Sequence, residues 1–122
     1  MSMKSNNILF TELVSFMTEI YGSLGYVDKN TKIEEDLRIT GDEAWDFLIK
    51  YGKYFNVETS NFIFSDYFEA EGIDFITPIL EILRLKRKKK KKELTIGDLI
   101  KGIEAGKLDD EIINTSKKNT EM

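Results

Sequence analysis

The spacing of apolar residues predicts a long amphipathic helix at the start of the chain. Over residues 6–24 the apolar positions recur every three or four residues, as they do on one face of an α-helix. These positions are Leu9, Leu13, Phe16, Met17, Ile20 and Leu24. Asn6 or Asn7 can cap the first turn, and Gly22 and Gly25 stand near the expected end.

A polar stretch, residues 26–39, separates this helix from a second one that is expected to run from Thr40 to about Tyr54. Thr40 and Glu43 have the spacing of a capping box, in which the Thr hydroxyl and the Glu carboxylate each accept from the other residue's amide. Asp42 adds a second acid where the helix dipole is positive. The apolar stripe of this helix is Ala44, Phe47, Leu48, Tyr51 and Phe55.

The second half of the chain is less regular. Residues 62–72 are rich in aromatic side chains and fit either an extended piece or one or two helical turns ended by Gly72. A Thr-Pro pair opens residues 77–92, which are predicted to form a helix that ends in lysines. A last helix is expected to begin at Thr95 and to extend a turn or two beyond Gly106. Its apolar stripe is Ile96, Leu99, Ile100 and Ile103.

These segments predict an all-α fold, a small bundle of four main helices with a long first loop. We expect a single domain over residues 1–113, with an inserted basic helix or loop at about residues 69–92 and a disordered tail at residues 114–122. No apolar stretch is long enough to span a membrane, and the N-terminus lacks the pattern of a signal peptide. A cytoplasmic location is therefore expected.

The chain contains no histidine and no cysteine. This composition excludes a Ser-His-Asp triad, a cysteine nucleophile and a structural zinc site. A carboxylate pair is still available, but Asp36, Asp42 and Glu43 are adequately explained as loop and cap acids. We therefore expect no catalytic residue, no metal site and no enzymatic activity.

Charge is concentrated in one segment, which we call the basic tract. Its residues are Arg84, Lys86, Arg87, Lys88, Lys89, Lys90, Lys91 and Lys92, and the rest of the chain carries 10 basic and 22 acidic residues. Lysines at a helix C-terminus complement the dipole, so a solvated helix end, or one that contacts the protein's own acids, is the preferred interpretation. Peripheral contact with anionic lipid is an alternative. Nucleic-acid binding is disfavoured, because the acidic body opposes it and the tract lacks aromatic residues for stacking.

The order of motifs resembles that of acyl carrier proteins. Residues 35–37 (EDL) match the acidic motif that ends the long first loop of that family, and Phe55 stands where a Phe closes its second helix. Residues 55–60 (FNVETS) and 93–103 (ELTIGDLIKGI) are similar to the segments that follow that helix and form the last one.

The resemblance covers roughly residues 5–66 and 93–105. It is closest to a set of bacterial carrier-like proteins of unknown function that lack the serine to which phosphopantetheine is attached. It implies the carrier-type bundle, and it also implies the position at which that serine would stand.

In carriers that serine lies in an Asp-Ser-Leu motif at the start of helix two, and its hydroxyl holds the 4′-phosphopantetheine arm. Here Thr40, Gly41 and Asp42 occupy the three positions. Gly41 has no side chain to modify, so the resemblance implies a carrier without its cofactor. The alternative is a working carrier, acyl or peptidyl, whose arm is attached to Thr40.

The resemblance also implies a partner-binding surface. Glu43 and Asp46 stand where carriers place acids that contact basic partner enzymes, and Asp42 and Trp45 lie beside them. We therefore expect binding to a protein with a basic surface, in the carrier case an enzyme of fatty-acid or secondary-metabolite synthesis. Five aromatic residues could also line an apolar pocket or belong to the core. They are Phe62, Phe64, Tyr67, Phe68 and Phe75.

Overall fold

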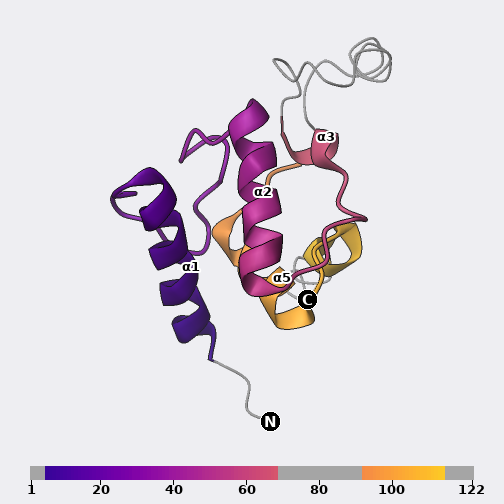
Figure 1. Cartoon of the computed structure of the whole chain (residues 1–122), viewed down its shortest axis with the longest axis horizontal. Helices are drawn as coiled ribbons and strands as arrows, with labels where there is room; N and C mark the ends of the chain where they lie inside the picture. The colour runs from indigo at the N-terminus through magenta and orange to yellow at the C-terminus, as the bar shows by residue number, and fades with distance from the viewer. Residues whose placement is uncertain (1–4, 69–91, 115–122) are drawn as a thin grey trace.

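A computed structural model describes residues 5–68 and 92–114, and in these parts of the chain it is helical without any β-strand (Figure 1). The prediction of an all-α fold is confirmed. The labelled helices are α1 (Asn6–Tyr21), α2 (Gly41–Phe55), α3 (Phe64–Tyr67) and α5 (Ile96–Ala105). Residues 110–114 add a short helical segment at the end. No described helix is long and apolar enough to cross a membrane.

Helix α1 follows the predicted pattern as far as Tyr21, with a different cap, and Leu24 lies beyond its end. Ser5, rather than Asn6 or Asn7, is the N-cap, and its hydroxyl accepts from the amide of Ile8 at 3.2 Å. The helix ends before Gly22, whose φ of 86° is favourable only for glycine. Its buried residues are Leu9, Leu13 and Met17.

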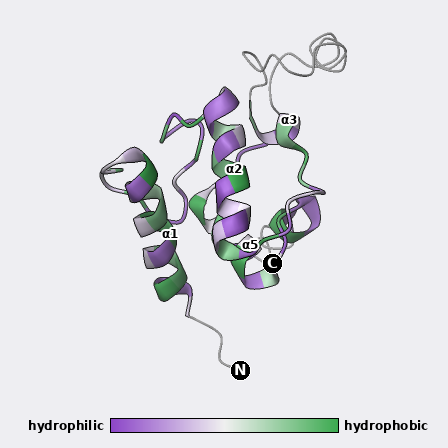
Figure 2. Cartoon of the chain, viewed as in Figure 1, coloured by the Kyte–Doolittle hydropathy of each residue, from purple (hydrophilic) through white to green (hydrophobic). Residues whose placement is uncertain are grey.

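Helices α1 and α2 lie side by side and run in opposite directions (Figure 1). The ring of Phe16 stacks on that of Tyr54 near the end of α2, and Tyr21 contacts Phe47, which lies nearer its start. Both helices alternate hydrophobic and hydrophilic residues along their length (Figure 2). The predicted core positions of α2 are confirmed, because Ala44, Phe47, Leu48 and Tyr51 are buried and Phe55 packs against them.

Helix α5 is held against α2 by a buried hydrogen bond. The hydroxyl of Tyr51 donates to the carbonyl of Leu99 at 2.7 Å. The Tyr51 hydroxyl also lies over Gly102, where an added Cβ would stand only 2.4 Å from the hydroxyl oxygen. This close approach explains why α5 carries a glycine in its middle despite the cost of glycine to helix stability.

The long loop between α1 and α2 is fastened to the start of α5. Ile33 donates its amide to the carbonyl of Leu94, and the amides of Ile96 and Gly97 donate back to the loop at 3.0 and 2.9 Å. Thr95 begins α5 as predicted, with a complete capping box to Asp98. The loop therefore has a defined path to the start of α2.

Two expectations for the C-terminal half need correction. The last helix does not extend beyond Gly106, which adopts a left-handed φ of 81° and ends it. Asn114, expected in the disordered tail, belongs to the helical segment at residues 110–114. Of the aromatic stretch, Phe64–Tyr67 forms the single helical turn α3. Gly72, the predicted helix at residues 77–92 up to Lys91, and residues 115–122 lie outside the described residues.

Phe68 and Lys92, the described residues on either side of residues 69–91, both lie beside α3. The amide of Lys92 donates to the carbonyl of Asp66 at 2.9 Å. The chain thus leaves and re-enters the described body at neighbouring positions.

Candidate partner-binding surface

One face of α2 points to solvent and carries an alternation of acids and large apolar residues. We call it the outer face, and its members are Asp42, Trp45, Asp46 and Ile49, all of them exposed. Their spacing of three and four residues places them in one stripe along the helix. Trp45 is 38% exposed and Ile49 is 44% exposed, so both present apolar surface to water.

A small pocket lies beside this stripe. Its walls are Trp45, Leu48 and Ile49 from α2, Thr59 and Phe62 from the segment that leads into α3, and Phe64 at the start of α3. The indole ring of Trp45 meets the ring of Phe64 edge to face at 5.2 Å, which fixes one wall. The cavity volume is about 90 Å³.

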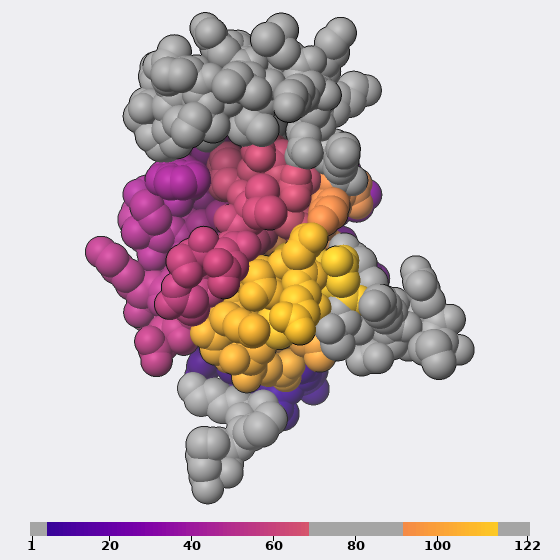
Figure 3. Space-filling view, turned by 90° about the vertical axis from the view of Figure 1, so that its right-hand side faces the viewer, coloured from indigo at the N-terminus to yellow at the C-terminus, as the bar shows by residue number. Residues whose placement is uncertain are grey.

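The far wall of the pocket exists because the chain folds back at the end of α2. Asn56 adopts a left-handed φ of 58°, and the amide of Val57 then donates to the carbonyl of Gly52 at 2.9 Å. A Cβ at Gly52 would stand 3.0 Å from the Val57 carbonyl oxygen. We call residues 56–63, which follow this turn, the returning segment. Figure 3 shows it lying between α2 and the residues after α5.

The acids at the start of α2 affect a tyrosine on α1. Partial burial raises the pKa of Tyr21 to about 12, and the nearby negative charges of Glu43 and Asp46 contribute to the increase. Asp46 also forms an exposed ion pair with Lys50 at 3.0 Å. Glu43 is exposed like the outer-face acids. The exposed surface at the start of α2 is therefore acidic both on the outer face and at Glu43 beside it.

The predicted capping box at the start of α2 is wrong. Thr40 is the N-cap residue, but its hydroxyl donates to the carboxylate of Glu34 and makes no cap hydrogen bond to the helix. The next residue, Gly41, has a φ of 60°, which is the left-handed region that side chains disfavour. The backbone at Gly41 is therefore suited to glycine.

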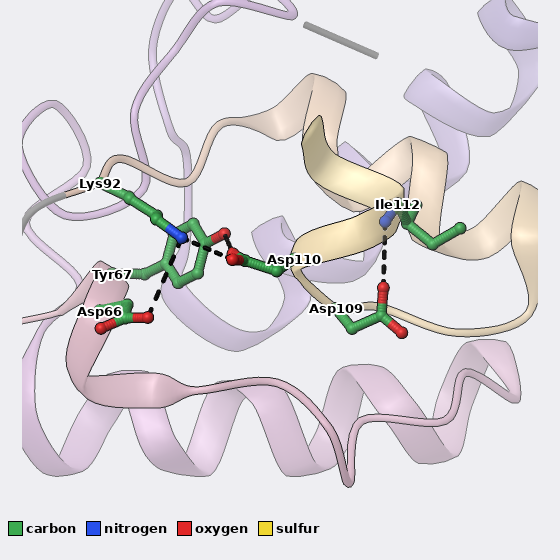
Figure 4. Close-up of polar contacts among 6 residues, drawn as sticks. All are labelled: Asp66, Tyr67, Lys92, Asp109, Asp110 and Ile112. Atoms are coloured by element: carbon green, nitrogen blue, oxygen red, sulfur yellow. Dashed lines mark hydrogen bonds and ion pairs between the residues drawn. The ribbon is translucent and has the colours of Figure 1, made fainter. Parts of the chain in front are cut away.

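The rest of the basic tract lies outside the described residues, which include only its last member, Lys92. Its ammonium group contacts the carboxylate of Asp110 at 2.6 Å and lies 5.7 Å from the ring centre of Tyr67 (Figure 4). The carboxylate of Asp66 lies 4.0 Å from the same ammonium group, and the Tyr67 hydroxyl donates to the carboxylate of Asp110. Lys92 therefore binds the protein's own acids, in accord with one part of the preferred interpretation.

The aromatic residues divide between core and pocket. Tyr67 and Phe68 are buried in the core, and Phe64 belongs to the core and also lines the pocket. Phe62 lines the pocket, and Phe75 lies outside the described residues. Sequence reasoning missed Ile49 and Thr59 as wall residues. Ile49 could have been found, since it follows Trp45 by four residues. Within residues 5–68 and 92–114, no cluster of side chains could hold a metal ion.

Comparison with known proteins identifies a family. The model of a family described as a protein of unknown function, DUF1493, matches residues 11–109, which is most of the chain. A search of curated proteins and a search of solved structures each found no match.

Proposed function

The chain belongs to the DUF1493 family, and we propose that it is a non-enzymatic module, similar to an acyl carrier protein, that binds a protein partner through the start of α2. In this proposal it carries no phosphopantetheine arm. Its binding surface consists of the outer face together with Glu43.

The observation that carries the proposal is the exposure of Trp45 and Ile49 among acids. Large apolar residues on a helix are normally placed on its buried side, and the buried side of α2 already has a full set. Aromatic residues are enriched among the side chains that dominate binding energy at protein interfaces. A partner would cover apolar surface that folding leaves exposed.

The arrangement of helices supports the carrier-like part of the proposal. In the described residues a long first helix and a long loop precede α2, and α5 lies where the resemblance implies the last helix of the carrier. The left-handed φ of Gly41 supports the absence of an arm, because a serine there would be strained by about 1–2 kcal/mol.

The charge of the surface defines the partner. Asp42, Glu43 and Asp46 are all exposed acids within the first two turns of α2. A complementary protein would present Lys or Arg, which steers association and selects against acidic surfaces. On the resemblance to carriers, an enzyme of fatty-acid or secondary-metabolite synthesis is the class to examine first.

The test is affinity capture of partners from the source cell, quantified by mass spectrometry. The wild type is compared with the double variant Glu43→Lys/Asp46→Lys. A matched control, Glu104→Lys/Glu111→Lys, makes the same change in net charge at exposed acids outside α2. We expect the first variant to lose a protein that wild type and control both retain. Identical sets of captured proteins would contradict the proposal.

A further inference from the structure

We infer that the pocket beside Trp45 receives a single aliphatic side chain of the partner, Leu, Ile or Met, from a segment that carries Lys or Arg on both sides. This inference rests on the proposed function and specifies the chemistry of the partner. It follows from the size of the pocket, its lining and the acids beside it.

The volume of the pocket selects the size of the occupant. At about 90 Å³ it is smaller than the cavity of about 150 Å³ that accommodates benzene in a protein core. Pockets for drug-sized ligands and cofactors are about 300–1,000 Å³. A branched or unbranched aliphatic side chain of three or four heavy atoms matches the space, whereas a cofactor exceeds it.

The lining selects an apolar occupant. Five of the six wall residues are aliphatic or aromatic, and Thr59 has the only side-chain hydroxyl among them. A polar group placed there would lose hydrogen bonds to water and recover few. An aliphatic side chain has none to lose, and it would also remove the exposed surfaces of Trp45 and Ile49 from water.

The position of the acids selects basic neighbours for that side chain. Asp42 precedes Trp45 by three residues, and Asp46 precedes Ile49 by three, so each exposed wall of the pocket on α2 has an acid one turn before it. The ion pair of Asp46 with Lys50 is exposed on both sides, and exchanging it for a partner's lysine costs little. An acidic segment would instead meet like charge.

The chain has a single tryptophan, so its indole N–H is a unique reporter of the pocket in a ¹H–¹⁵N NMR spectrum. The probes are three short synthetic peptides. The first has one Leu between lysines, the second has that Leu replaced by Ala, and the third has the lysines replaced by Glu. We expect the first peptide to shift the indole signal saturably. The other two should bind at least about tenfold more weakly, as expected when an anchor is truncated.

Two variants with the same substitution locate the binding. Ile49→Asp places a charge in the pocket wall, and Ile8→Asp changes an equally exposed isoleucine on α1. We expect Ile49→Asp to weaken the Leu peptide at least about tenfold and Ile8→Asp to leave it unchanged. No saturable indole shift with the Leu peptide, or equal binding of the Leu and Ala peptides, would overturn the inference.

Partner capture from the source cell separates this inference from the proposed function. Loss of the partner with Ile49→Asp as well as with Glu43→Lys/Asp46→Lys supports both. Loss with the charge variant alone shows that the surface binds the partner without the pocket, which refutes the inference and leaves the function standing. Retention by every variant contradicts both.

Discussion

The two sides of α2 differ in what their large residues contact. On the inner side, Phe47 and Tyr51 are fully buried. The ring centre of Phe47 lies 6.2 Å from those of Phe16 and Tyr21 and 6.1 Å from that of Tyr51. On the outer side, Trp45 and Ile49 line the pocket beside the returning segment and still face water. Packing accounts for the inner residues completely. It leaves the outer ones partly unexplained, and this difference is the basis of the functional proposal.

The comparison predicts that stability depends on the inner side and that binding depends on the outer side. The effect of a substitution on stability is measured as the change in the free energy of unfolding, by urea denaturation. The outer-side substitution is also measured for peptide binding.

The largest effect is expected for Phe47→Ala. Removing a fully buried aromatic ring of α2 that packs against α1 should lower the free energy of unfolding by about 3–5 kcal/mol. A loss below about 1 kcal/mol would show that the inner side is not the core of the molecule.

Gly102→Ala should lower the free energy of unfolding by about 1–3 kcal/mol, because the added methyl group overlaps the Tyr51 hydroxyl. Tyr51→Phe alone should cost about 1 kcal/mol through the lost hydrogen bond to Leu99. Since Phe lacks the overlapping oxygen, the double variant should lose less than the sum of the two. Strict additivity would mean that the two residues do not meet.

Alkaline pH should destabilise the fold through the tyrosines. Burial, with a contribution from Asp98, raises the pKa of Tyr51 above its ordinary value of 10.0, and the pKa of Tyr21 is raised to about 12. The folded state therefore holds protons that the unfolded state releases, so stability is complete below pH 10 and falls as the pH rises through 12. Urea denaturation on both sides of pH 10 measures this loss. Tyr51→Phe should reduce it, and an unchanged pH profile in that variant would contradict the assignment.

The smallest effect on stability is expected for Ile49→Asp on the outer side, about 1 kcal/mol or less, because the side chain is already 44% exposed. The same substitution should weaken binding of the Leu peptide at least about tenfold. A large loss of stability with no loss of binding would reverse the roles that we assign to the two sides.

Much of the fold could be predicted because the long helices are strongly periodic. The buried stripes of α1, α2 and α5 were all readable from spacing, and so were the N-cap positions Thr40 and Thr95. Helix ends were harder. The Thr40 hydroxyl bonds to Glu34, six residues away, and Gly106 ends α5 although acids and apolar residues continue beyond it. In the first case a hydrogen bond to the preceding loop replaced the expected cap, and in the second a left-handed backbone conformation ended the helix. Neither follows from the spacing of apolar residues.

The candidate site was only partly predictable. Asp42, Trp45 and Asp46 lie on one stripe because they follow one another at helical spacing in α2, so that spacing was enough to group them. The pocket needed Thr59, Phe62 and Phe64 to return beside that stripe, and the turn that achieves this depends on Asn56 and Gly52. Neither residue has a signature that specifies the path of the following chain.

The most direct test of a carrier-like body without its arm is the intact mass of the protein purified from its source cell. The measurement is repeated after incubation with coenzyme A and a broad-specificity phosphopantetheinyl transferase. The proposal predicts the mass of the unmodified chain in both cases. A gain of one phosphopantetheine would contradict it, and peptide mapping of the attachment to Thr40 would show that this hydroxyl serves in place of the missing serine.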